Sequence, residues 1–200
     1  MKRALTSFCA ATLLLAVGCA APVTVNPNGP LRAQKGAVPL LRVTISFEEG
    51  SWAGQPGWGG MSQPNPRRVF ARLASAAAQE TGAMNVPEPR KIKSTISARG
   101  EKYTLNPDAK RLKSYLAILE PHAYLTAELK AWQENYYTGL FQDSTLTFTL
   151  TCRRPGESEP LWTATVDREE NYMSARELAR ESLEQAFERV MARTEKEGPQ

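Results

Sequence analysis

The chain has 200 residues, 42% of them hydrophobic, and its 25 basic and 21 acidic residues give a net charge of +4. This size and composition fit one domain with a genuine hydrophobic core. The small positive charge predicts no basic patch, so nucleic acid is a poor candidate partner, because tracking phosphates requires clustered Lys and Arg.

Residues 1–18 have the layout of an export signal. Met1-Lys2-Arg3 is a short basic head, Ala4–Val17 is an apolar run and Gly18-Cys19 follows. The apolar run is too short to span a membrane with stop-transfer flanks. The sequence therefore predicts export, with removal of the leader.

Cys19 is the predicted site of a lipid anchor. Ala16-Val17-Gly18-Cys19 resembles the lipobox of bacterial lipoproteins, with Ala16 where Leu is usual. The resemblance implies a diacylglycerol and an N-acyl chain on Cys19, with no other cofactor. It also implies that Ala20, the next residue, permits delivery to the periplasmic face of the outer membrane. The alternative is an ordinary secretory signal cut at Ala20-Ala21.

The segment after the cysteine predicts a spacer and then a single domain. Residues 19–38 are rich in Pro, Asn and Gly, which favours a flexible tether. The globular domain is predicted over residues 39–195, with a frayed tail over 196–200. Its first strand is expected in Leu41–Phe47, where apolar and polar residues alternate.

A glycine-rich segment with two tryptophans follows this strand. Its glycines start too far from the strand for a dinucleotide loop, and the Gly-Lys-Ser/Thr of a phosphate loop is absent. Trp52 and Trp58 are candidates for contact with a membrane or a partner, because Trp suits amphipathic boundaries. The alternative is that both side chains fold back onto the domain.

Two helices and a second strand are predicted next. Asn65-Pro66 is a helix-start signal, and Gly82 is a suitable end. Lys91–Ala98 is a candidate strand, since two of its apolar residues lie at even spacing. Asn106-Pro107 begins the next predicted helix, which Pro121 ends.

Three more strands are predicted as an antiparallel meander, over His122–Trp132, Thr145–Cys152 and Leu161–Val166. In each of the first two, apolar residues alternate with polar ones. One face is therefore expected to be buried, and the other, rich in threonine, to face solvent or a partner. Cys152 shares the apolar register and is predicted to be a small buried hydrophobe.

Aromatic residues of the meander are further candidates for partner contact. Trp132 falls on the polar side of the first strand's alternation, and Tyr136 and Tyr137 follow it. We expect these three side chains, with the threonines, to form a docking surface.

The last predicted helix completes the fold class. Ser174-Ala175-Arg176-Glu177 is a capping box at its start. The element order predicts an α/β (α+β) fold with a single mixed β-sheet, an antiparallel C-terminal meander and helices packed on the sheet. The first helix is expected to connect two neighbouring parallel strands.

Several segments resemble the CsgG/LpoB/PelC-like periplasmic lipoproteins. They are the strand Leu41–Phe47, the run His122–Leu129 with the aromatics after it, the strand Thr145–Cys152 and Pro160-Leu161-Trp162. The resemblance covers about Leu40–Arg193. It implies a CsgG-like, outer-membrane-anchored periplasmic domain that binds protein partners, in some members as a ring.

The residues themselves predict no catalyst and no metal site. His122 is the sole histidine, without a second histidine or a cysteine at ligand spacing. The adjacent pairs Glu48-Glu49 and Glu169-Glu170 point to opposite faces of an extended chain, so neither pair forms a two-carboxylate site. No nucleophile elbow or zinc signature is present.

Three functions follow as hypotheses. The first is a non-catalytic accessory in envelope assembly or secretion and export, which binds envelope protein partners and can self-assemble as a homo-oligomer. The second is a monomeric activator or regulator of a cell-wall synthase, suggested by the long tether. The third is a periplasmic hydrolase with an unrecognised site.

Overall fold

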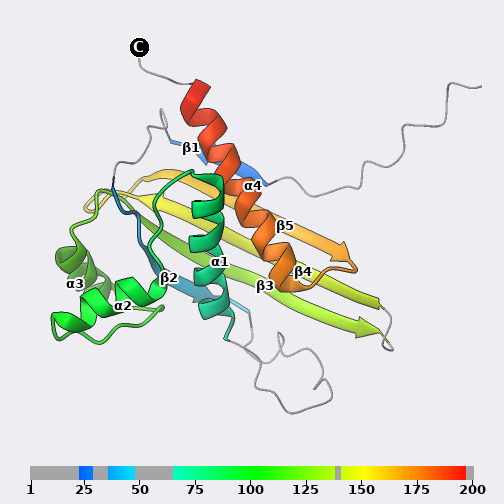
Figure 1. Cartoon of the computed structure of the whole chain (residues 1–200), viewed down its shortest axis with the longest axis horizontal. Coiled ribbons are helices and arrows are strands. Elements are labelled where there is room, and N and C mark those ends of the chain that lie inside the picture. Colours follow the sequence, from blue (N-terminus) through cyan, green and yellow to red (C-terminus); the bar gives the residue numbers. More distant parts are fainter. Residues whose placement is uncertain (1–22, 29–35, 48–64, 138–140, 197–200) are drawn as a thin grey trace, which may run out of the picture.

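A five-stranded mixed sheet in the order β1-β5-β4-β3-β2 organises the computed structural model (Figure 1). The structure describes residues 23–28, 36–47, 65–137 and 141–196. Its strands and helices are β1 (Thr24–Pro27), β2 (Leu40–Ile45), α1 (Pro66–Thr81), α2 (Pro89–Ala98), α3 (Ala109–Leu119), β3 (Tyr124–Tyr137), β4 (Phe141–Arg153), β5 (Pro160–Asn171) and α4 (Ala175–Lys196). The predicted class, a mixed sheet with packed helices, is confirmed.

The antiparallel meander is confirmed and is longer than predicted. Strands β3, β4 and β5 pair antiparallel in chain order, whereas β2 pairs parallel with β3. A parallel connection was expected, but with one helix; here α1, α2 and α3 all lie between β2 and β3.

Part of the predicted tether is a strand of the sheet. β1 pairs antiparallel with β5, with Thr24 opposite Thr165. Val23 and Val25 are buried on the core face, and Val38 is buried as well. The tether prediction is therefore wrong for residues 23–28 and 36–38. The alternation of Val23 and Val25 with polar residues is the pattern that indicates a strand here.

The predicted strand Lys91–Ala98 is helix α2. Pro89 stands in its first turn, which Pro favours, and Ile92 and Ile96 are buried. A spacing of four residues fits one face of a strand and equally one face of a helix, so it could not decide between them. The strand prediction is wrong.

The main core lies between one face of the sheet and helices α1 and α4, which cross that face side by side (Figure 1). Phe70 of α1 meets Phe148 of β4 edge to face, with ring centroids 5.0 Å apart. As predicted, Asn65 caps α1 by accepting from the N–H of Arg67 at 3.0 Å, and Gly82 ends it in the left-handed conformation.

A second, smaller core lies on the opposite face, at the β2 end of the sheet. The β2–β3 register shifts between Leu40 and Arg42, and Leu41 is buried away from the main core, among residues of α2 and α3. Tyr124 and the fully buried Tyr115 complete this cluster. α2 and α3 thus cover only one end of that face.

Helix α4 is held at its start by polar contacts. Ser174 and Glu177 form the predicted capping box, with the Ser174 N–H and hydroxyl both donating to the Glu177 carboxylate. Further along, the buried Arg168 of β5 contacts Glu170 at 2.7 Å and Glu181 of α4 at 3.8 Å. In the described part of the chain, no helix is long and apolar enough to cross a membrane.

Candidate functional site

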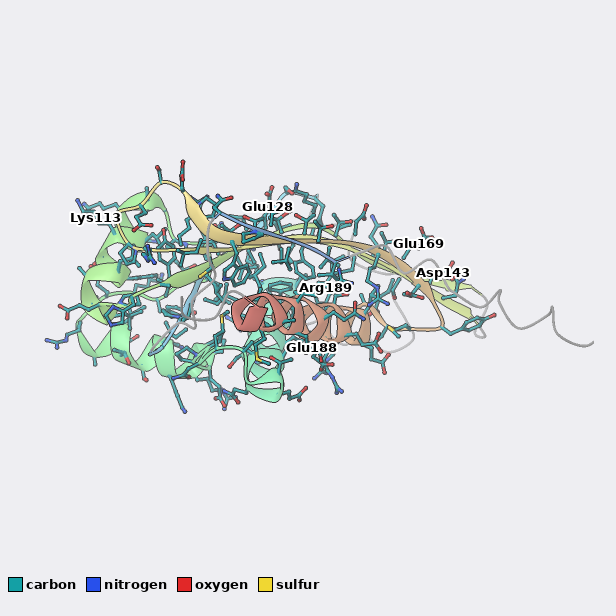
Figure 2. All side chains as sticks on the ribbon, turned by 90° about the horizontal axis from the view of Figure 1, so that it is seen from above. Lys113, Glu128, Asp143, Glu169, Glu188 and Arg189 are labelled. Atoms are coloured by element: carbon teal, nitrogen blue, oxygen red, sulfur yellow. The ribbon has the colours of Figure 1, made fainter. Side chains whose placement is uncertain are left out.

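One broad face of the sheet has no helix of the described residues over it beyond the α2–α3 end. Figure 2 shows Glu128 and Glu169 on this side, away from α4 with its Glu188 and Arg189. The pairing aligns Thr24, Thr165, Thr149, Glu128 and Thr44 in one row across all five strands.

We call this surface the threonine face. Its threonines are Thr24, Thr44, Thr126, Thr145, Thr147, Thr149, Thr151, Thr163 and Thr165. Those of β3 and β4 are half-buried, while Thr24 and Thr165 are exposed. The predicted alternation of β4, with apolar residues inside and threonines outside, is confirmed.

Acidic side chains accompany the threonines. Glu128, Asp167 and Glu169 share the face by register, and the Thr147 hydroxyl donates to Asp167 at 2.7 Å. Among the described residues the only large hydrophobic side chain that is well exposed is Tyr172, which follows β5. The threonine face is therefore polar and hydrogen-bonding rather than apolar.

Trp132 is not on this face. An extra residue, Lys130, shifts the β3–β4 register between Leu129 and Ala131. Ala131 then pairs with Thr147, while Trp132 pairs with Leu146 in the main core and is only 7% exposed. The prediction of Trp132 as a contact residue is wrong, because the bulge reverses the face of every later residue in β3.

The other predicted contact residues have side chains outside the part of the chain that the structure describes. Cys19, Trp52 and Trp58 lie outside the described residues. Tyr136 and Tyr137 belong to β3, but their side chains also lie outside the described ones.

Cys152 and His122 are the candidate reactive side chains that the structure describes. Cys152 is fully buried, as predicted, and burial raises the pKa of its thiol to about 12. The thiolate, which is the nucleophilic form, is thus disfavoured at neutral pH. His122 is exposed, and no group of three or more His, Cys, Asp or Glu within the described ranges could hold a metal ion.

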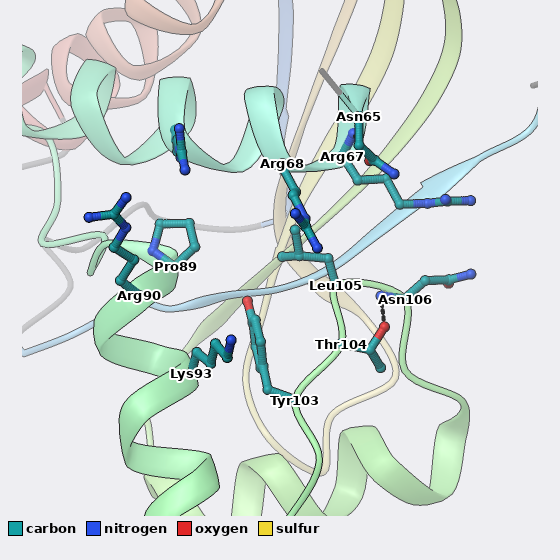
Figure 3. A pocket seen from close by; sticks show the side chains of 11 residues that line it. Asn65, Arg67, Arg68, Pro89, Arg90, Lys93, Tyr103, Thr104, Leu105 and Asn106 are labelled. Carbon is teal, nitrogen blue, oxygen red and sulfur yellow. Dashed lines mark hydrogen bonds between the residues drawn. The ribbon is translucent and has the colours of Figure 1, made fainter. Parts of the chain in front are cut away.

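A basic pocket, which sequence analysis missed, lies between α1, α2 and the segment before α3 (Figure 3). Its volume is about 430 Å³. Its charged lining residues are Arg67, Arg68 and Arg72 from α1 and Arg90 and Lys93 from α2. The prediction that the chain has no basic patch is therefore wrong, since folding gathers cations that lie up to 26 residues apart.

The wall opposite these cations is held in place by hydrogen bonds. The Tyr115 hydroxyl donates to the Lys102 carbonyl at 2.7 Å and accepts from the Thr104 N–H at 3.0 Å. The Leu105 carbonyl accepts from the Val43 N–H of β2 at 2.6 Å. The segment that carries Tyr103 is therefore fixed by Tyr115 and by β2, which holds Tyr103 at the wall of the pocket.

Tyr103 carries the unusual polar atom of the pocket. Its hydroxyl oxygen is buried, and no described residue forms a hydrogen bond with it. Burial, and to a lesser extent neighbouring Tyr115, raises the pKa of Tyr103 well above its usual value. The phenol therefore stays protonated and can act only as a neutral donor or acceptor at neutral pH.

Four of the five cations lack a carboxylate partner within the part of the chain that the structure describes. Among the described residues no carboxylate forms an ion pair with Arg68, Arg72, Arg90 or Lys93. Glu88 lines an adjoining hollow of about 340 Å³, which shares Pro89 and Arg90 with the pocket. The basic pocket is thus a concentration of positive charge in a chain that is nearly neutral overall.

Comparison with known proteins identifies the fold. The PelC dodecamer from Paraburkholderia phytofirmans is similar at a TM-score of 0.56 and 10% identity, over 85% of this chain and 96% of that one. A PelC variant dodecamer from the same organism gives 0.55 and 12%, over 86% and 99%. The chain shares the PelC fold. At these identities the likeness establishes the fold alone.

Other comparisons add little. The lipoprotein GNA1162 from Neisseria meningitidis is similar at a TM-score of 0.46 and 15% identity, over 68% of this chain and 83% of that one, which is too low to support an inference. A scan of the sequence against protein-family models found no match, and a search of curated proteins found none either. The predicted resemblance is thus confirmed for the PelC fold.

Proposed function

We propose that this protein is a non-catalytic accessory of envelope assembly or export, anchored by lipid on Cys19, that self-assembles through its threonine face. The observation that carries the proposal is the contrast across the sheet: α1 and α4 cover one face, while most of the other is open. The shared fold with PelC, which was solved as a dodecamer, supports assembly of many copies.

The threonine face suits contact with a second copy. Its β-branched side chains are restricted in χ1, so holding them in an interface costs little conformational entropy. Their hydroxyls supply donors and acceptors across a surface five strands wide. A contact between this face and a different surface of the next copy is heterologous, which is the type that closes into a ring.

The anchor belongs to the same proposal. A lipid on Cys19 would hold the chain at the periplasmic face of the outer membrane, and confinement to one surface favours assembly by raising the local concentration. The intact mass of the mature chain tests this part. We expect an acylated cysteine at position 19; an unmodified amino terminus further along would contradict it.

Sedimentation velocity of the full chain in density-matched detergent tests the assembly. We expect wild type to form an oligomer and Thr149→Arg to sediment as a monomer, because the introduced charge would be buried in the contact. Thr95→Arg is the matched control: the same change on the exposed surface of α2 should leave the oligomer intact.

Two outcomes would contradict the proposal. The first is a wild-type chain that remains a monomer at every concentration, which would favour a monomeric regulator instead. The second is assembly of Thr149→Arg with the wild-type sedimentation coefficient, which would place the contact elsewhere.

A further inference from the structure

We propose that the basic pocket binds a phosphate-bearing ligand, as a phosphomonoester or diphosphate group joined to a small organic part. The proposal is independent of self-assembly, because none of the threonines of the threonine face is among the residues that line the pocket. It assigns a small-molecule site to a chain whose sequence suggested none.

The charge of the pocket selects the ligand's charge. Five cationic side chains line about 430 Å³, and none of the described lining residues carries a carboxylate. Cations held this close repel one another, and a ligand with several negative charges relieves more of that repulsion than a single carboxylate does. Arginine guanidinium groups also match phosphate oxygens in bidentate geometry.

The arrangement of the cations gives them a common target. Arg68 reaches from α1 and Lys93 from α2 toward the side of the pocket where Tyr103 stands (Figure 3). α1 and α2 both begin at the pocket, at Asn65 and Pro89, so the positive ends of two helix dipoles add to the same field. The helix ends alone would not define a site, but here they reinforce a cluster of side chains.

Tyr103 provides a neutral donor inside this field. Its buried hydroxyl has no hydrogen-bond partner among the described residues, an arrangement that costs stability unless a ligand supplies one. A phosphate oxygen would accept that hydrogen bond. The Tyr103 ring, Pro89 and Leu105 are half-buried and provide an apolar surface for the organic part of the ligand.

The pocket is also fixed before any ligand arrives. The fully buried Tyr115 holds the backbone on both sides of Tyr103, and β2 holds Leu105. A preorganised wall reduces the entropy lost on binding, so a small ligand is sufficient to occupy it.

Calorimetric titration of the full chain in nonionic detergent with inorganic diphosphate tests the proposal. We expect saturable binding of one ligand per chain with a dissociation constant below about 1 mM at low salt. The double variant Arg68→Gln, Lys93→Gln should weaken binding by about tenfold or more, since charge-assisted hydrogen bonds are lost. The control Lys110→Gln, Lys113→Gln removes the same charge from exposed α3 and should change affinity less than about twofold.

Tyr103→Phe separates a ligand role from a structural one. It removes only the buried hydroxyl that lacks a partner, so the melting temperature should stay the same or rise. Diphosphate affinity should nevertheless fall about fivefold or more. A variant that loses stability and keeps its affinity would overturn the role assigned to Tyr103.

The same titration distinguishes the sources of the phosphate. Binding of a short-chain phosphatidic acid with the same sensitivity to Arg68→Gln, Lys93→Gln would indicate a lipid headgroup. Binding of glucose 6-phosphate but not of phosphatidic acid would indicate a soluble ester. The proposal is overturned if diphosphate shows no saturable heat. It is overturned as well if the α3 control weakens binding equally, or if an acidic peptide binds and diphosphate does not.

Discussion

The two faces of the sheet are built from the same strands, but helices cover one face and leave most of the other uncovered. On one face Leu146, Phe148 and Leu150 of β4 pack beneath α1 and α4. On the other, the intervening threonines are half-buried by their neighbours in the sheet, and most of the face has no helix over it. The difference indicates that the helices build the domain, while the open side remains available for contact.

The alternation of apolar and polar residues predicts the two faces correctly in β4 but not along the whole of β3. Strict alternation identified the buried and open sides of β4, because the pleat has a period of two residues. In β3 the same rule fails after Leu129, where one extra residue moves Trp132 into the core. The predictions below test this contrast between a face that holds the fold together and one that does not.

Trp132→Ala should give the largest effect. Because the side chain is packed in the main core, we expect a loss of about 3–5 kcal/mol in the free energy of unfolding. Gln133 is the next residue and lies on the open face, so Gln133→Ala should change the free energy of unfolding by less than about 0.5 kcal/mol. Denaturant unfolding of both variants measures this, and equal effects would contradict the shifted register.

Arg168→Ala should give an intermediate loss. It removes a buried cation that bonds Glu170 and Ser182 and approaches Glu181, tying β5 to α4. Since both carboxylates are partly exposed, we expect about 1–3 kcal/mol rather than the full penalty of a buried pair. Arg189→Ala, on the exposed side of α4, is the control, and thermal unfolding distinguishes the two.

Ser174→Ala should give the smallest effect, about 1 kcal/mol, through loss of the helix cap. The hydrogen bonds that Glu177 accepts from the Ser174 hydroxyl and then from its N–H lower the pKa of that carboxyl. The stability that the Glu177 carboxylate contributes is therefore present above the pKa that this group has in the unfolded chain. It is lost as pH falls through the lower pKa of the folded state. Glu177→Gln should be less stable than wild type at pH 7, with the difference narrowing in acid; a constant difference would contradict the capping role.

The sequence contained most of the fold and little of the pocket. Alternation, capping residues and a helix-breaking glycine predicted the meander, the starts of α1 and α4, and the end of α1. The spacing of Ile92 and Ile96 was ambiguous, and the short β1 offered only two alternating valines. Local patterns of this kind have too few residues to exclude a competing structure.

The basic pocket depends on contacts that no local pattern encodes. Arg68 and Lys93 lie 25 residues apart in the sequence, and they line one pocket only because α1 and α2 both begin there. The first turns of the two helices did carry a signal, since arginines follow the initiating Pro66 and Pro89. Only the packing of the helices shows that those arginines face one cavity.

The most direct test of the central claim is the accessibility of the threonine face as copies associate. A cysteine introduced by Thr149→Cys would be labelled with a maleimide over a range of protein concentrations in detergent, while the buried Cys152 stays silent. We predict that labelling at position 149 slows as concentration rises, whereas labelling of Glu188→Cys on α4 stays constant. A labelling rate at position 149 that stays constant over the same range of concentrations would contradict the proposal that this face joins one copy to the next.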